Sequence, residues 1–338
     1  MQIRIGVIGV GESWERRHKL ALVRLSDKFE VRAVYDEVAH RAKVAAAELE
    51  CDAVDGFTSL VERDDVDAVY ILGTSWLGVE PVRTACHARK AIYLGTPFGP
   101  EMAYADETID LVRSSGVRFM AEFPWRFYPA TIRLMELLAS GLGTPQLANC
   151  EQNVLFRETH ARSNRTRASA ELEQAEVVLH MADWLRFVFG REPVRVQSPG
   201  EQKFDYGPCR KMETFVADFG QGGVGRATAC HFADSHWVEA TRHAQARCFQ
   251  VVAEHGVAYV EMPGQITWFD SSGRHEESLE MERSLGEMLS DRFYRIVVHG
   301  LNPSPSLADA AAARAIVLEA RAARPAAASR EVRHLTAG

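Results

Sequence analysis

The sequence contains no uninterrupted apolar run that could cross a membrane. No segment approaches the roughly 18 to 20 consecutive apolar residues that a membrane-spanning helix requires. The N-terminus, Met1 to Gly9, is too short and too strand-like for a secretory signal peptide, and no cleavage site of small residues follows it. We therefore expect a cytoplasmic protein that does not contact a membrane.

Cysteine is scarce, and no two cysteines form a C-x-x-C pair. The six cysteines are scattered along the chain, at Cys51, Cys86, Cys150, Cys209, Cys230 and Cys248. Such spacing is typical of reduced thiols and argues against a disulfide framework or a zinc site. We expect no metal.

The chain also lacks an excess of positive charge. It has 39 Lys and Arg against 46 Asp and Glu, which gives a formal net charge of −7. Non-specific binding to nucleic acid requires a basic surface, so we expect no nucleic-acid partner. Apolar residues make up 46% and charged residues 25% of the 338 residues, which is ordinary globular composition and a length typical of about two domains.

The first third of the chain alternates short β-branched runs with helical patterns. The first run, residues 3–8, is almost continuously apolar, as expected of a strand that is covered on both faces. The predicted strands are 3–8, 30–35, 67–72, 91–94 and 117–121, and the predicted helices are 14–25, 37–49, 79–88 and 102–114. This order predicts a Rossmann domain in residues 1–123, with a doubly wound parallel sheet.

After residue 123, strands joined by turn residues dominate. The predicted strands are 147–156, 215–219, 225–232, 248–253, 258–262 and 265–269, and the predicted helices are 130–138, 170–189 and 285–299. A last helix begins at Ser306, where Ser306 and Asp309 suit a capping box. We therefore expect an α/β chain whose C-terminal α+β domain, residues 124–338, has an open and mostly antiparallel sheet.

A glycine-rich turn follows the first strand. Gly9, Val10 and Gly11 stand between a strand and a helix, which is where a dinucleotide pyrophosphate binds in such folds. Asp36 ends the second strand, where a carboxylate bonds the ribose hydroxyls and favours NAD over NADP. Trp14 replaces the third glycine and Glu12 adds a negative charge, so a turn that kept its shape without a ligand is the alternative.

Three polar residues share one face of the predicted helix 170–189. Spacings of four and three residues place Glu176, His180 and Asp183 on the same side of an otherwise apolar helix. Buried polar groups need partners, so we expect this face to line a cleft. The alternatives are a hydrogen-bonded structural trio and, less favoured, a metal site.

Arginines precede that helix. Residues 157–167 contain four of them, and Arg162 and Arg165 are the candidates to hold a carboxylate or phosphate, because guanidinium groups bind such anions bidentately. Arg126 is a further candidate for the cleft between the domains. The alternatives are a solvated loop for the segment and a pairing with a carboxylate for Arg126.

These residues resemble the Gfo/Idh/MocA family of glucose–fructose oxidoreductase, inositol dehydrogenase and their relatives. The resemblance spans nearly the whole chain: Ile3 to Gly11, Asp36, Asp67-Ala68-Val69, residues 90–97, Arg126-Phe127-Tyr128-Pro129, Gly141 to Pro145, residues 176–183 and Pro303-Ser304-Pro305-Ser306. It implies oxidation or reduction of a hydroxyl or carbonyl carbon of a sugar, cyclitol or related compound with NAD(P). It also implies a homodimer or homotetramer that forms through the C-terminal sheet.

The chain departs from the family's strongest motif, Glu-Lys-Pro. The corresponding residues are Gly95, Thr96 and Pro97, so the lysine that hydrogen-bonds the reacting oxygen is absent, and a threonine hydroxyl cannot exchange a proton near neutral pH. After the fourth strand Thr74 is kept, and we assign it with Pro97 to cofactor binding. By the resemblance, His180 is the acid/base residue and Glu176 takes the place of the family's aspartate. In a redox reaction we expect Glu176 to orient the ring of His180 and Thr96 to bond the oxygen.

Three hypotheses follow for the function. The first is an atypical NAD(P)-dependent oxidoreductase, favoured by Asp36 and His180. The second is a family member without redox chemistry that binds a nucleotide or sugar as a regulator or partner subunit. The third is a lyase or hydrolase that uses His180 and Glu176. The missing lysine, Glu12 and Trp14 favour the second and third.

Overall fold

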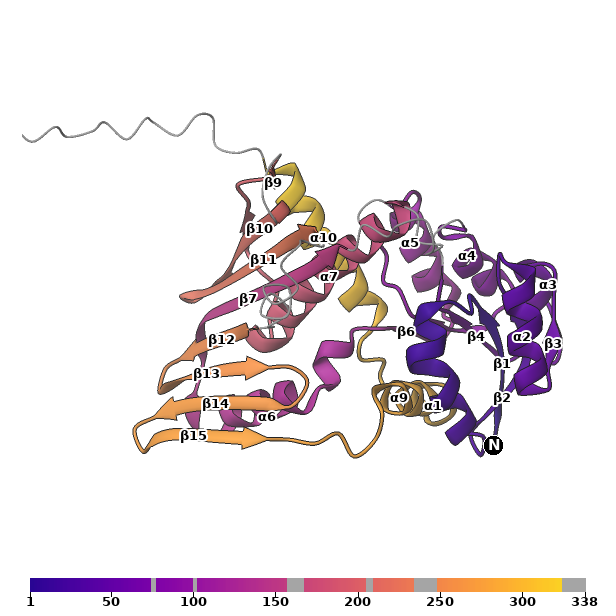
Figure 1. Ribbon diagram of the computed structural model, residues 1–338, viewed down its shortest axis with the longest axis horizontal. Helices are drawn as coiled ribbons and strands as arrows, with labels where there is room; N and C mark the ends of the chain where they lie inside the picture. Colours follow the sequence, from indigo (N-terminus) through magenta and orange to yellow (C-terminus); the bar gives the residue numbers. More distant parts are fainter. Residues whose placement is uncertain (74–76, 100–101, 157–166, 205–208, 234–247, 324–338) are drawn as a thin grey trace, which may run out of the picture.

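The computed structural model describes residues 1–73, 77–99, 102–156, 167–204, 209–233 and 248–323. These residues form two sheets with helices packed on them (Figure 1). The first sheet uses strands from residues 3–121, and the second uses strands from residues 145–278.

The first sheet is parallel and has the strand order β3-β2-β1-β4-β5-β6. Its strands are β1 (Ile3–Ile8), β2 (Phe29–Tyr35), β3 (Asp52–Ala53), β4 (Ala68–Ile71), β5 (Ala91–Leu94) and β6 (Phe119–Ala121). This is the doubly wound order of a dinucleotide-binding fold, and it confirms the predicted Rossmann sheet. The sequence pattern did not predict β3, which has only two residues.

Helices cover both faces of this sheet. They are η1 (Trp14–His18), α1 (Lys19–Arg24), α2 (Ala39–Leu49), α3 (Phe57–Val61), α4 (Glu80–His87), α5 (Ala105–Ser115) and, from late in the chain, α9 (Leu285–His299). The predicted helix 14–25 thus begins as a π-helical turn, η1. Phe293 of α9 lies 5.5 Å from the ring centres of both Tyr70 and Tyr93, so the late helix completes the first sheet's layer.

The second sheet has the order β15-β14-β13-β12-β7-β11-β10-β8, with β9 paired to β10. Its strands are β7 (Pro145–Phe156), β8 (Arg195–Gln197), β9 (Glu201–Lys203), β10 (Cys209–Gly220), β11 (Gly223–Ala233), β12 (Cys248–Ala253), β13 (Gly256–Glu261), β14 (Gln265–Asp270) and β15 (Gly273–Ser278). Neighbours pair antiparallel except β7 and β11, which are parallel. The predicted mostly antiparallel sheet is confirmed.

Helices pack on one face of the second sheet. They are η2 (Pro124–Phe127), α6 (Pro129–Leu137), η3 (Leu138–Leu142), α7 (Arg167–Phe189) and α10 (Leu307–Ala322). The contact is close, since a Cβ at Gly225 of β11 would lie 3.2 Å from the Leu185 side chain of α7. On the opposite face Val224, Tyr259 and Phe269 each expose more than a third of their surface.

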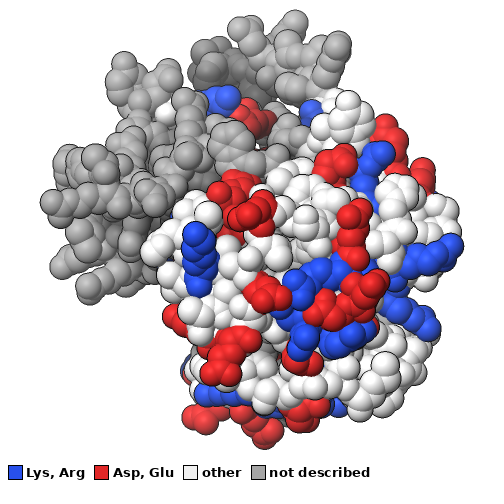
Figure 2. Space-filling view, turned by 90° about the vertical axis from the view of Figure 1, so that its right-hand side faces the viewer, with Lys and Arg blue, Asp and Glu red and all other residues white. Residues whose placement is uncertain are grey.

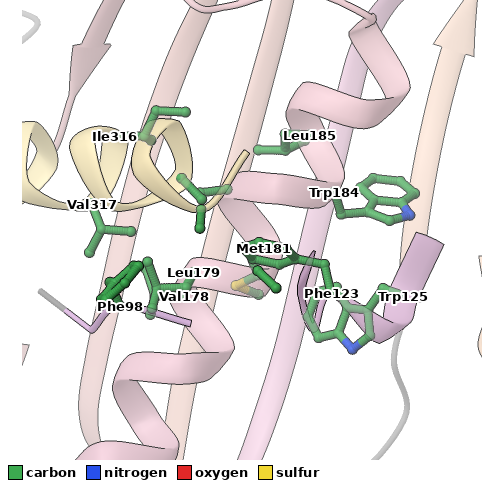
Figure 3. Packing of buried hydrophobic residues seen from close by; sticks show 14 of the residues in the cluster. Phe98, Phe123, Trp125, Val178, Leu179, Met181, Trp184, Leu185, Ile316 and Val317 are labelled. Atoms are coloured by element: carbon green, nitrogen blue, oxygen red, sulfur yellow. The ribbon is translucent and has the colours of Figure 1, made fainter. Parts of the chain in front are cut away.

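One apolar cluster joins the two sheets. It contains Phe98 from the loop after β5, Trp125 of η2 and residues of α7 and α10, which Figure 3 shows packed together. The packing therefore fixes the carboxyl end of the first sheet against the helices of the second.

The described surface at the β3 edge of the first sheet mixes both signs of charge. Figure 2 shows acidic and basic side chains interspersed on this end of the molecule. Ion pairs at the edge include Arg63 with Asp65 at 2.7 Å and Arg32 with Asp65 at 3.2 Å. Among the described residues, no helix is both long enough and apolar enough to span a membrane.

Candidate functional site

The glycine turn after β1 packs directly against the chain that follows β4. Gly9 has φ +91°, and a Cβ there would lie 2.6 Å from the backbone nitrogen of Gly73, so only glycine fits. At Gly11, a Cβ would meet no atom within 4 Å. The backbone of Gly11 therefore faces open space at the start of a helix, as a pyrophosphate-binding turn requires.

Asp36 is held at this turn by backbone groups. Its Oδ2 accepts a 2.9 Å hydrogen bond from the Val10 N–H, and its Oδ1 accepts one of 2.9 Å from the Val38 N–H. Each carboxylate oxygen has a second lone pair, so these bonds leave acceptors for ribose hydroxyls. Arg41 Nη1 lies 3.8 Å from Oδ1, which adds a cation beside the carboxylate.

The two unusual residues of the turn have distinct places. Glu12 pairs with Arg16 one turn along the helix, at 2.8 Å, so a cation offsets its charge. Trp14 is fully buried and opens the π-helical turn η1. Trp14 stands at the third glycine position of the motif, and its indole packs in the apolar core under the first sheet.

A buried polar cluster that the sequence analysis missed lies next to this turn. Glu122, directly after β6, is 0% exposed, accepts a 2.7 Å hydrogen bond from the Tyr93 hydroxyl and pairs with Arg17 of η1. His18 Nε2 lies 3.1 Å from Glu122 Oε2. The cluster joins the helix after the glycine turn to the ends of β5 and β6. The available signal was a carboxylate inside the buried run Met120-Ala121-Glu122-Phe123.

His18 is neutral in this cluster. Burial, and to a smaller extent the charge of Arg17, lower its pKa from 6.5 to about 3. The contact with Glu122 is therefore not an ion pair at neutral pH, and the charge of Glu122 is met by Arg17.

His180 lies on α7 next to two aromatic rings. The ring centre of Trp125 is 5.5 Å and that of Phe123 is 5.8 Å from the imidazole centre. Both rings come from the segment after β6, so His180 faces the carboxyl end of the parallel sheet. Glu176, one helical turn earlier, is half-buried like His180.

Arg126 and Asp183 bind each other inside the protein. Arg126 Nε donates to Asp183 Oδ2 at 2.7 Å, and its Nη2 bonds both Asp183 Oδ1 and, at 2.9 Å, Asp309 Oδ1. Burial raises the pKa of Asp183 to about 6, against the opposing charge of Arg126. The pairing with a carboxylate, one of the two possibilities for Arg126, is thus observed, while contact of either residue with a substrate stays a prediction.

Thr96 and Pro97 follow β5 at the same carboxyl end of the parallel sheet. Leu94, the last residue of β5, accepts a 2.9 Å hydrogen bond from the Glu122 backbone N–H, and Phe123 of that segment contacts His180. The structure therefore brings the Thr96 loop, the glycine turn and His180 to the carboxyl end of the first sheet. Thr96 is half-buried and Pro97 is buried.

Some predicted site residues lie outside the described residues. These are Thr74 and the arginine segment with Arg162 and Arg165. Within the described residues, no three His, Cys, Asp or Glu side chains are grouped so that they could hold a metal ion. The described turn fits a dinucleotide, because Gly9 closes it and Gly11 leaves its backbone open.

The comparisons with known proteins agree with this geometry. Residues 3–123 match the model of the oxidoreductase family with the NAD-binding Rossmann fold. The chain is 29% identical over 141 residues to a dTDP-3,4-didehydro-2,6-dideoxy-alpha-D-glucose 3-reductase of Actinomadura kijaniata, covering 41% of this chain and 42% of that protein. It is 31% identical over 157 residues to a D-xylose 1-dehydrogenase (NADP(+)) of Haloferax volcanii, covering 45% of each.

A solved structure extends the likeness of the fold to nearly the whole chain. The UDP-N-acetylglucosamine 3-dehydrogenase of Acidithiobacillus ferrooxidans superimposes with a TM-score of 0.76 at 21% identity, over 96% of this chain and 99% of that one. The sequence matches are shorter, since the chain spans about half the length or less of the two curated relatives named above.

The strand order and the glycine turn define a protein with a dinucleotide-binding type of Rossmann domain. Residues 3–123 are similar to the NAD-binding Rossmann domain of the Gfo/Idh/MocA oxidoreductases.

Proposed function

We propose that this protein is an NAD(P)-dependent oxidoreductase acting on a hydroxyl or carbonyl carbon of a sugar, cyclitol or related small molecule. The observation that carries the proposal is the glycine turn: Gly9 is closed against Gly73, while Gly11 faces open space beside the Asp36 carboxylate. This shape suits a dinucleotide, and the names of the relatives describe sugar dehydrogenases and reductases.

Each site residue has a role in the proposal. The nicotinamide, when bound, supplies or accepts the hydride. His180 gives or takes the proton of the reacting oxygen, Glu176 orients the imidazole, and Thr96 donates a hydrogen bond to that oxygen. Trp125 and Phe123 exclude water from one side of the imidazole.

The choice of NAD over NADP is part of the proposal. The Asp36 carboxylate would repel a 2′-phosphate, which favours NAD. Arg41, 3.8 Å away, weakens that repulsion. We expect NADH to bind more tightly than NADPH, and the Arg41→Ala variant to widen the difference.

The first experiment is a calorimetric titration with NADH and NADPH. Binding with a dissociation constant below millimolar supports the proposal, and no heat at millimolar cofactor contradicts it. Turnover with a panel of free sugars, cyclitols and nucleotide-linked sugars then tests the chemistry. His180→Ala should lower turnover by about 100-fold or more and leave a measurable residual rate. His255→Ala, which changes an exposed histidine, should leave turnover unchanged.

A binding protein without redox chemistry is the second candidate. The observation that favours it is Thr96, which provides no charged acid or base where the family resemblance implies a lysine. Cofactor or sugar binding without turnover over the whole panel would support this candidate.

The assembly and the compartment are also proposals. We propose a homodimer or homotetramer formed through the open face of the second sheet, where Asn149, Gln250, Thr214 and Thr228 lie beside the exposed Glu151 and Arg226. We propose the cytoplasm because the cysteine usage suits a reducing compartment, and the described cysteines Cys51, Cys86, Cys150 and Cys230 are free thiols.

A further inference from the structure

Asp309, in the first turn of α10, uses its two carboxylate oxygens for different partners. Oδ1 accepts hydrogen bonds from Arg126 Nη2 at 2.9 Å and from Arg186 Nη1 at 3.3 Å, and Oδ2 accepts 2.8 Å bonds from the backbone N–H and the hydroxyl of Ser306. The Ser306 bonds form the capping box of α10. The helix itself therefore fixes the acceptor that Arg126 meets.

Arg126 is held by carboxylates of two helices. It binds Asp183 of α7 through two nitrogens and Asp309 of α10 through one of them. Its side chain is 9% exposed, and the guanidinium lies 5.0 Å from the ring centre of Phe187. Because guanidinium donors form a rigid fork, these contacts fix the backbone on which Arg126 stands.

That backbone carries the rings that flank His180. Trp125 directly precedes Arg126 in η2, and Phe123 directly precedes η2. A four-residue 3-10 helix has little stability of its own. The contacts of Arg126 therefore add a polar anchor to the apolar packing that holds the two rings, such as that of Trp125 on Phe249.

α10 also holds the loop that carries Thr96. Arg314 of α10 donates to the backbone oxygen of Gly99, and the Pro305 oxygen before α10 accepts a 3.4 Å bond from the Ala121 N–H of β6. Figure 3 shows Val317 of α10 and Phe98 of that loop near Leu179 of α7. One helix thus contacts both segments that bound the site.

We propose that Asp309 and Arg126 are positioning residues for His180. α10 fixes the Asp309 carboxylate, Arg126 transmits that position to η2, and Trp125 and Phe123 hold the imidazole in one orientation. The inference rests on the role of His180 proposed above. The orientation of the ring is measurable whether or not the chain transfers hydride.

The test uses Asp309→Asn and Arg126→Lys. Asparagine keeps an oxygen for Ser306 but loses the charge, and lysine keeps the charge but loses the fork. Glu287→Gln is the matched control, because Glu287 occupies the same capping-box position in α9 and pairs with Arg24. NMR of histidine-labelled full-length protein reports the ring-proton shifts and titration of His180, assigned with His180→Ala, and denaturation reports folding.

We expect both variants to shift the His180 ring resonances and its titration midpoint, and Glu287→Gln to leave them unchanged. With an active substrate, kcat should fall by about tenfold to 100-fold while KM changes less than about threefold, the range for a slightly misplaced catalytic group. In a His180→Ala background, Arg126→Lys should have no further effect on kcat.

Unchanged His180 resonances in folded Arg126→Lys overturn the proposal. An equal loss of kcat with and without His180 also overturns it. If Asp309→Asn does not fold, Arg126→Lys alone decides. If no substrate is turned over, the proposed redox function fails, and the resonances still support or overturn the positioning.

Discussion

Thr96 stands where the family resemblance implies a lysine, and this exchange removes a charged group from the expected position of the reacting oxygen. Its neighbours are otherwise in place: Pro97 is buried and the preceding strand β5 is fully buried. The missing lysine is therefore a local change, and the carboxyl end of the first sheet around it is otherwise intact.

Thr96→Lys is expected to raise turnover. An amine at this position restores a group that can exchange a proton, and such groups contribute about 100-fold or more in rate. Steady-state kinetics on the substrate panel measures the gain, with Thr96→Met as a control of similar length and no charge. Equal rates for the lysine and methionine variants would refute the expected role of the charge.

His18 makes stability depend on pH. Its folded-state pKa of about 3 lies below the ordinary 6.5, so the unfolded chain binds a proton between these values and the folded protein does not. Stability is complete above pH 6.5 and falls as the pH drops toward 3. At pH 5 the loss amounts to about 2 kcal/mol.

The measurement is urea denaturation of wild type and His18→Gln at pH 7.5 and pH 5. The variant should lose about 2 kcal/mol less than wild type on acidification. His255→Gln, at an exposed position, should behave as wild type. A pH dependence of His18→Gln equal to that of wild type would show that burial does not depress this histidine's pKa.

At the scale of elements, the two glycines of the glycine turn have different roles. Gly9 has a left-handed φ and touches backbone, while Gly11 has open space beside it. The turn's shape therefore depends on the first glycine, and in the proposed function cofactor binding depends on the second.

Gly9→Ala is expected to destabilise the fold by at least about 2 kcal/mol, because the new Cβ is strained and meets the Gly73 nitrogen. Gly11→Ala should leave unfolding almost unchanged and weaken NADH binding at least about tenfold, since its Cβ enters the space that the pyrophosphate needs. Denaturation and calorimetry distinguish the two effects. Equal cofactor affinity of Gly11→Ala and wild type would contradict the placement of the pyrophosphate.

The sequence predicted the elements that carry apolar runs or cap residues, and it missed β3, α3 and the polar strand β15. The residue ranges 91–94, 248–253 and 285–299 are reproduced, and the Ser306–Asp309 capping box is confirmed, because apolar runs and cap residues are local signals. β3 and α3 have too few residues for a periodic pattern. The parallel pairing of β7 with β11 depends on a connection that no local pattern encodes.

The site was predictable only where its chemistry is local. The glycine turn and the polar helix face of residues 176–183 are short motifs, and the structure brings both to the carboxyl end of the first sheet. The Arg126–Asp183 pair joins residues 57 positions apart, and Glu122 meets partners in η1 and β5. Tertiary packing alone creates such contacts.

At the scale of the whole molecule, the open face of the second sheet is the surface that we propose for assembly. Tyr259 and Phe269 lie on it as diagonal neighbours, with ring centres 6.3 Å apart. Exposed aromatic residues on an uncovered sheet face suit contact with a second copy of the same face.

We expect sedimentation to give a mass of at least twice the chain's 37.6 kDa. The double variant Tyr259→Arg/Phe269→Arg should sediment as a monomer, because charge repulsion and lost apolar contact both oppose association. Leu20→Arg, at an exposed apolar residue of α1, should not change the mass. A wild-type monomer, or a double variant of unchanged mass, would exclude this interface.

The packing of α9 on the first sheet has a consequence for biosynthesis. Tyr70 and Tyr93 leave the ribosome some two hundred residues before Phe293, the side chain that seals them from water. Until Phe293 is synthesised, this side of the first sheet exposes apolar surface to water. The first sheet therefore cannot complete its packing until α9 has been synthesised. A fragment that stops at residue 123 is expected to aggregate instead of folding.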